Sequence, residues 1–188
     1  SHGCDDTIDF NITNPAEISI ISKSIIDVNC FGGNTGELEV NVNNTVGSYD
    51  IFWMPNEFNT DTELITDLFA GKYDAVVIDE NGCTKLDSFF INQTDNIDLD
   101  LSIINSSCKL NADGQIVINN IFGGTAPFMI YNNSSLVESN IMSSATISSL
   151  LTTEGVDPHT LLITDNYDCQ YTKEVEVGFD GGYACISE

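Results

Sequence analysis

The chain contains an internal repeat, and this feature restricts its fold more than any other. Residues 30–36 (CFGGNTG) and 108–114 (CKLNADG) both place a cysteine six positions before a glycine, and an alternating apolar pattern follows each glycine. Residues 73–83 and 159–169 both place an aspartate four positions before a cysteine. These two motifs occur in the same order in both halves of the chain, which predicts two modules of the same fold. The segment between the two motifs is longer in the second module.

A third copy of the ending lies at the start of the chain. The segment from Cys4 to residue 12 runs in step with the segment from Cys83 to residue 91. We therefore expect residues 1–15 to be the last strand of a truncated preceding module. Residues 16–95 and 96–178 are the two predicted repeats, and we expect residues 179–188 to be a linker to a following domain.

Each repeat reads as all-β. Stretches of four to eight residues rich in Val, Ile, Thr and Phe alternate with turn clusters of Gly and Asn. In the first repeat, strands are expected at 17–28, 37–43, 49–54, 62–66, 73–79 and 85–91. No segment has a helical period. The predicted fold is a tandem of small antiparallel, Ig-like β-sandwich modules stacked end to end.

The charge of the chain excludes two classes of partner. Asp and Glu number 29 against 5 Lys and Arg, which gives a formal net charge of −24. Nucleic acids and anionic membrane surfaces both require clustered basic residues. No apolar run is long enough to cross a bilayer, so direct membrane insertion is not expected. The expected partners are neighbouring repeats of the same chain and an unidentified surface or glycan ligand.

Six cysteines without a C-x-x-C pair, and only two histidines, favour extracellular disulfides over a zinc site. Two pairings are open. If modules stack end to end, Cys30 meets Cys169 and Cys108 meets Cys185. The simpler alternative closes each repeat on itself, with Cys30–Cys83 and Cys108–Cys169. It requires cysteines at opposite ends of a strand to approach within about 7 Å.

Catalytic residues are not expected. No histidine lies near a nucleophile motif, and nothing marks paired carboxylates as buried. His159 stands where the first repeat has Tyr73, at a position typical of a tyrosine corner, so a structural role is favoured for it. Tyr49, Ile51 and Trp53 share one face of a strand, and a core role is favoured over a sugar-binding platform. We predict that the chain is not an enzyme.

Calcium is the one ion that the sequence suggests, and otherwise no cofactor is expected. Carboxylate and amide oxygens gather in three turns, as Ca²⁺ requires, although none of the turns fits the twelve-residue EF-hand loop. The candidate ligands are Asp79, Glu80, Asn81, Asn111, Asp113, Asp165, Asn166 and Asp168. Asp and Asn also favour turns for purely local reasons.

The pattern C-F-G-G-x-x-G, the aromatic strand with Trp53, L-x-A-G-x-Y and D-x-N-G-C resembles the SprB repeat. This family occurs in giant surface adhesins of gliding Bacteroidota. The second repeat departs from the pattern at Lys109 and Leu110, at His159 and at Asp168. The resemblance implies type IX secretion and a role in gliding motility at the cell surface.

Two weaker similarities accompany it. Residues 6–8 are similar to the Asp-Thr-aliphatic motif that is O-glycosylated in Bacteroidota, which makes Thr7 a candidate site. Residues 182–186 are similar to the approach to C-terminal sorting domains.

Together these observations predict a non-catalytic structural and adhesive repeat region of a large secreted surface protein, an adhesin stalk. One alternative is a set of carbohydrate-binding or spacer modules of a secreted polysaccharide-degrading enzyme. The other is an extracellular fibre subunit, which the unpaired first strand (residues 7–12) would serve by strand exchange.

Overall fold

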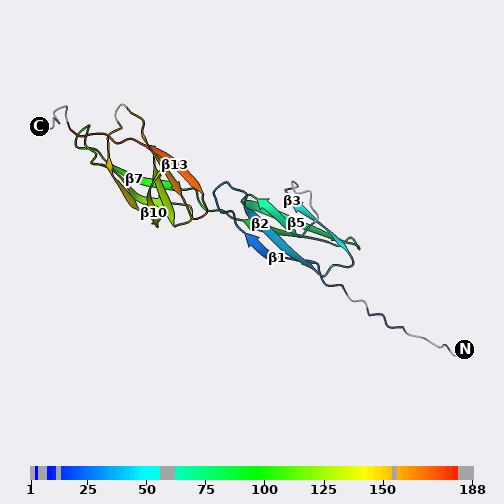
Figure 1. Cartoon of the computed structure of the whole chain (residues 1–188). Coiled ribbons are helices and arrows are strands. Elements are labelled where there is room, and N and C mark those ends of the chain that lie inside the picture. The colour runs from blue at the N-terminus through cyan, green and yellow to red at the C-terminus, as the bar shows by residue number, and fades with distance from the viewer. Residues whose placement is uncertain (1–2, 4–7, 12–13, 56–61, 154–155, 182–188) are drawn as a thin grey trace. The chain divides into compact units, whose positions relative to one another are not determined.

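The computed structural model describes residues 3, 8–11, 14–55, 62–153 and 156–181 (Figure 1). In this part of the chain there are thirteen strands and no helix, and so no helix that could span a membrane. The strand pairs within residues 98–175, and the pair formed by residues 49–54 and 71–79, are antiparallel. The all-β prediction is confirmed.

The first six strands form two three-stranded sheets. One sheet has the order β1 (Ser19–Ile26), β2 (Gly36–Asn43), β4 (Leu64–Leu68), and the other β3 (Tyr49–Met54), β5 (Gly71–Asp79), β6 (Thr84–Ile91). Buried and more exposed residues alternate along β2 and β5, because successive side chains point to opposite faces of a sheet. Trp53 on β3, which is 1% exposed, donates its indole N–H to the carbonyl of Thr62, just before β4. This bond ties the two sheets together.

The remaining strands form a four-stranded and a three-stranded sheet. The first has the order β10 (Ser135–Ile141), β9 (Phe128–Asn132), β12 (His159–Thr164), β13 (Gln170–Val175). The second has the order β11 (Ala145–Leu150), β8 (Gly114–Phe122), β7 (Asp98–Ile104). Residues of both sheets form one apolar core, which includes Ile116, Ile118, Ile130, Leu161 and Ile163. Two antiparallel sheets that share a core are a β-sandwich.

The chain divides into two compact units that differ in their limits from the predicted repeats. The first contains Ser1–Ile25, Glu37–Thr66 and Gly71–Phe90, and the second contains Ile26–Gly36, Asp67–Ala70 and Ile91–Glu188. The loop Ile26–Gly36 groups with the second unit because of its contacts there. Val28 bridges to Gln93, and Cys30 is bonded to Cys169.

The strand expected at residues 7–12 is absent from its described part. Residues 8–11 have no regular structure, and Phe10 is 83% exposed. The physical reason is that a single strand has no stability without a partner that accepts and donates its backbone hydrogen bonds.

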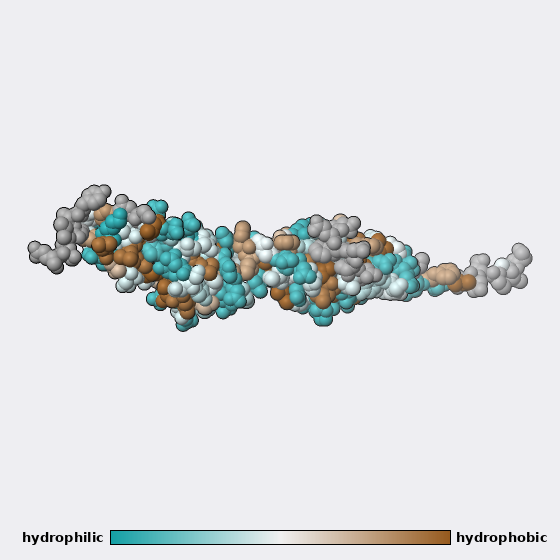
Figure 2. Space-filling model, turned by 45° about the horizontal axis from the view of Figure 1, so that its top comes forward, coloured by the Kyte–Doolittle hydropathy of each residue, from teal (hydrophilic) through white to brown (hydrophobic). Residues whose placement is uncertain are grey.

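The surface is mixed. On the face drawn in Figure 2, hydrophilic residues are interspersed with smaller apolar areas. Among the exposed apolar side chains are Phe52 on β3 and Phe90 on β6, which are 49% and 60% exposed. The high net negative charge favours solubility of the chain despite these residues.

Candidate functional site: the cysteine turns

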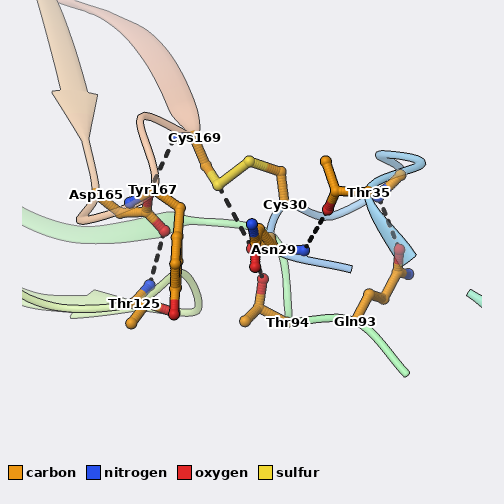
Figure 3. The surroundings of a disulfide bond; sticks show 10 residues. Asn29, Cys30, Thr35, Gln93, Thr94, Thr125, Asp165, Tyr167 and Cys169 are labelled. Carbon is orange, nitrogen blue, oxygen red and sulfur yellow. Dashed lines mark hydrogen bonds between the residues drawn. A yellow bond between two sulfur atoms is a disulfide. The ribbon is translucent and has the colours of Figure 1, made fainter. Parts of the chain in front are cut away.

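The turn between β12 and β13 is built around the carboxylate of Asp165, which is 2% exposed. Its Oδ1 accepts the N–H groups of Tyr167 at 2.8 Å and of Cys169 at 3.0 Å. Its Oδ2 accepts the N–H of Thr125 at 2.8 Å (Figure 3). One buried carboxylate therefore satisfies three backbone donors and fixes the position of Cys169.

The turn between β5 and β6 has the same construction around Asp79. Oδ1 accepts the N–H groups of Asn81 and Cys83, and Oδ2 accepts the N–H of Val46 at 3.2 Å. Burial opposes ionisation of Asp79, but these backbone hydrogen bonds outweigh it and hold the pKa of the carboxyl below its ordinary value. The repeated Asp-x-x-x-Cys motif is thus a structural turn that presents a cysteine.

The cysteine loops that precede β2 and β8 are also alike. In the first, the N–H of Val28 donates to the carbonyl of Asn92, and the N–H of Gly33 donates to the carbonyl of Cys30. The second loop repeats both bonds at the corresponding positions, from Ser106 to Gly178 and from Asn111 to Cys108. The structure therefore builds the same cysteine loop twice, down to individual hydrogen bonds.

The glycine six residues after each loop cysteine is required by close packing. A Cβ on Gly36 would lie 2.8 Å from the Leu68 carbonyl oxygen, and a Cβ on Gly114 would lie 2.7 Å from Cγ1 of Val177. Neither distance leaves room for a side chain. This explains why both copies of the motif place glycine where the strand begins.

Cys30 and Cys169 form a disulfide with a Cα–Cα distance of 5.4 Å, inside the second unit (Figure 3). The loop around it is well held: the hydroxyl of Thr94 donates to the Asn29 carbonyl at 3.0 Å, and the N–H of Gly32 donates to Gln93 Oε1 at 2.8 Å. Sγ of Cys169 lies 3.5 Å from the same Asn29 oxygen. The disulfide thus closes a loop that is already ordered by hydrogen bonds.

The alternative pairing of Cys30 with Cys83 and of Cys108 with Cys169 is wrong. Cys83 is an exposed free thiol, and Cys169 is already bonded to Cys30. Cys83 lies directly before β6. The Cys30 loop is hydrogen-bonded to Gln93, which lies just after the other end of the same strand. Eight residues of strand span roughly 26 Å, far more than a disulfide bridges.

Cys108 is disulfide-bonded as well. The predicted partner, Cys185, and the first cysteine, Cys4, lie outside the described residues.

The calcium candidates lie in three turns and do not converge. In the described part of the chain, no three His, Cys, Asp or Glu side chains come together as metal ligands. Asp113 accepts both the N–H and the hydroxyl of Ser107, and the hydroxyl bond is the main reason that the pKa of Asp113 is lowered. The carboxylates of Asp79 and Asp165 are engaged in the same way with backbone N–H groups.

The remaining candidates have structural positions. Trp53 is a core residue, as expected. The hydroxyl of Tyr49 donates to Glu63 at 2.5 Å, and this bond, with burial, raises the pKa of Tyr49 to about 12. His159 starts β12, with its ring nitrogens 3.5 Å from Asn133 Nδ2 and 3.4 Å from the Leu151 carbonyl. Thr7 lies outside the described residues.

The geometry defines a class: small β-sandwich modules in which a carboxylate-centred turn and a glycine-closed loop each present a cysteine. Residues 22–58 match the SprB repeat family. This confirms the resemblance that the sequence showed, for the segment from β1 to just after β3. No curated protein matches the chain.

Solved structures with similar features contain immunoglobulin and fibronectin type III domains. The IG1+IG2 structure of DIP-gamma is 13% identical, with a TM-score of 0.39, and the match covers 88% of this chain and 99% of that one. The Sidekick-1 immunoglobulin domains 1–5 are 10% identical, with a TM-score of 0.37, over 88% of this chain and 40% of that one. The central fibronectin-III array of RIM-binding protein is 13% identical, with a TM-score of 0.34, over 85% and 69%.

Proposed function

We propose that this chain is a non-catalytic structural and adhesive repeat region of a large, secreted cell-surface protein. The observation that carries the proposal is the construction of the same cysteine loop and the same cysteine turn twice in one chain. The match of residues 22–58 to the SprB repeat family supports it, because the family resemblance implies surface adhesins, type IX secretion and gliding motility.

The chemistry of the described residues supports a structural role. The disulfide Cys30–Cys169 is typical of proteins in oxidising, extracellular compartments. The buried carboxylates of Asp79 and Asp165 serve backbone donors rather than a substrate. In this proposal the modules act as load-bearing spacers, and their partners are neighbouring repeats and a surface or glycan ligand.

The location and the role are tested on cells that produce the protein. Antibodies against residues 1–188 should label intact cells, and external protease should remove the label. Deletion of the gene should reduce attachment or gliding, while growth in suspension stays normal. Labelling only after permeabilisation, or attachment and gliding equal to the parent strain, would contradict the proposal.

A second candidate function is carbohydrate binding within a polysaccharide-degrading protein. Phe52 and Phe90, both exposed on the sheet of β3, β5 and β6, favour it, because exposed aromatic rings can stack on sugars. Binding of the purified chain to a glycan array, reduced at least tenfold by Phe52→Ala or Phe90→Ala, would support this alternative. Turnover of any polysaccharide by the purified chain would contradict the non-catalytic role.

A further inference from the structure

We propose that Cys83 and the pocket beside it form a docking and disulfide site for the cysteine loop of another module of this kind. The loop has the pattern Cys-x₅-Gly, of which residues 30–36 are an example in this chain. The inference rests on the proposed function only in requiring that such modules occur in series.

The first observation is the equivalence of Cys83 and Cys169. Both occupy the last position of an Asp-x-x-x-Cys turn, and the N–H of each donates to Oδ1 of the turn aspartate, at 2.9 Å for Cys83 and 3.0 Å for Cys169. In both turns the aspartate N–H donates to the carbonyl of the cysteine at 3.1 Å. Yet Cys169 is bonded to a loop cysteine, whereas Cys83 is an exposed free thiol.

The second observation is the pocket beside Cys169, which shows how a cysteine loop packs against such a turn. A cavity of about 240 Å³ in the second unit has the loop residues Cys30 and Phe31 as one part of its wall. The rest of the wall comes from the segment before β7, from Gly124 in the loop between β8 and β9, and from the turn: Thr94, Asp95, Asn96, Ile97, Asp168, Cys169 and Gln170.

The first unit has a corresponding pocket beside Cys83. Its volume is about 310 Å³. Its wall contains the segment before β1, two residues of the loop between β2 and β3, and the turn: Asn14, Pro15, Ala16, Glu17, Ile18, Asn44, Val46, Asp79, Cys83 and Thr84. Ile18 and Ile97 occupy the same place, directly before the first strand of each sandwich, and are 5% and 3% exposed. Among the described residues that form this wall, none corresponds to Cys30 and Phe31.

The contacts of the loop at Cys169 predict which contacts it makes at Cys83. Gln93 accepts the N–H of Gly32 through its side-chain amide oxygen, and Asn14 provides the same group at the corresponding position. Thr94 donates its hydroxyl to the Asn29 carbonyl, whereas Pro15 has no donor. The docked loop would therefore keep one of these two anchoring bonds and the disulfide.

The bond forms by thiol–disulfide exchange with an external disulfide, either a small molecule or an oxidoreductase. The Cys83 thiolate attacks one sulfur of that disulfide and releases the first thiol. The loop thiolate then attacks the Cys83 sulfur of the mixed disulfide and releases the second thiol. The two cysteines lose two electrons to the external disulfide, and the released thiolates take up the two protons.

The main test adds one module to the chain. A copy of residues 14–92 carrying Cys83→Ser is inserted directly before residue 14 of the otherwise unchanged chain, which supplies one extra cysteine loop and leaves Asn14 and Pro15 in the wall of the pocket. After oxidation, non-reducing peptide mapping should find a linked peptide that contains Cys30 of the copy and the original Cys83, in addition to Cys30–Cys169. Maleimide should label Cys83 in the unextended chain and lose at least nine tenths of this labelling in the extended one.

Full labelling of Cys83 in an oxidised, folded extended chain would overturn the proposal. So would a Cys83 that is already blocked in the unextended chain. Because neither measurement involves cells, a failure here is distinguishable from a failure of the proposed adhesive role.

A second measurement covers the case in which the extended chain does not fold. A peptide of residues 26–36, activated at Cys30 as a mixed disulfide with pyridine-2-thiol, should react with Cys83 about tenfold faster than a scrambled peptide does, because docking raises the local concentration. Ala16→Trp, which fills the pocket, should abolish this difference, whereas Cys83→Ser should abolish both reactions. Equal rates for the two peptides would overturn the proposal.

Discussion

At the scale of single residues, the aspartates of the cysteine turns have the clearest role. Each carboxylate accepts three backbone N–H groups. The side chain thus supplies the hydrogen-bond acceptors that a neighbouring strand would otherwise supply at the end of the hairpin. The sequence pattern singled out Asp79 and Asp165 as candidate calcium ligands and left a purely local turn role open beside that interpretation. A calcium-binding turn and a turn closed by its own carboxylate have the same oxygen-rich sequence pattern. Only the positions of the backbone N–H donors in the folded chain distinguish the two.

Asp165→Asn should destabilise the second unit by about 2 kcal/mol, because the amide NH₂ replaces one acceptor and faces an N–H donor. The matched control is Asp168→Asn in the same turn. Asp168 is exposed with a φ of 62°, a conformation that Asn tolerates well, so this change should stay within about 0.5 kcal/mol. Urea unfolding of both variants measures the difference, and equal midpoints would contradict the assigned role.

The hydrogen bonds of Asp79 predict a dependence of stability on pH. Because folding lowers the pKa of this carboxyl, its stabilisation is complete above the unfolded value, about 4, and is lost as the pH falls through the folded value. Asp79→Asn should therefore lower the urea midpoint at pH 7, and the gap to the parent chain should narrow at pH 3. Asp50→Asn, at an exposed position on β3, is the control and should change the urea midpoint little at pH 7. A gap for Asp79→Asn that does not change with pH would refute this linkage.

The same engagement of carboxylates predicts that calcium adds little. With Asp79, Asp113 and Asp165 already holding N–H or hydroxyl donors, millimolar Ca²⁺ should leave the thermal midpoint as it is in Mg²⁺ at equal ionic strength. A ligand that binds only the folded state must raise that midpoint. A rise of several degrees in Ca²⁺ alone would establish a specific site.

At the scale of elements, the positions of the strands follow from alternation, and the sequence therefore predicted them well. The strand at 49–54 has the predicted limits, and β2 and β6 begin one residue earlier than expected. The strand expected at 62–66 is instead β4, Leu64–Leu68. Its start is displaced because the Thr62 carbonyl accepts the indole N–H of Trp53, a contact between distant residues that no local pattern contains.

The glycines at the starts of strands test the packing of these elements. Gly114→Ala should destabilise the chain by about 1–3 kcal/mol, because the new Cβ would lie 2.7 Å from Val177 and 3.0 Å from the Leu150 carbonyl oxygen. Gly71→Ala, at the start of β5, is the control: a Cβ at this position would have no neighbouring atom within 4 Å, so the change should be neutral or slightly stabilising. Equal destabilisation by both changes would contradict the packing explanation for the glycine that both repeats place after the loop cysteine.

At the scale of the whole molecule, the disulfide determines how much chain can extend under load. Cys30 and Cys169 are 139 positions apart in sequence, so the bond encloses most of the chain. The sequence alone left this pairing open beside its alternative, because the choice depends on where loops lie after folding. A bond that encloses so many residues prevents their extension even after the sandwiches unfold, which suits a spacer that must keep its length.

This leads to a mechanical prediction for the chain pulled from its two ends. The Cys108→Ser variant keeps the Cys30–Cys169 bond and loses the disulfide of Cys108. Its complete unfolding should release about 480 Å more contour length with reductant than without, because each of the 139 positions that separate the two cysteines in sequence adds about 3.5 Å. Adding Cys30→Ser and Cys169→Ser should give the longer contour under both conditions. Single-molecule force spectroscopy measures these lengths. If the Cys108→Ser chain extends to the same length with and without reductant, the disulfide does not bear load and the spacer role loses its mechanical basis.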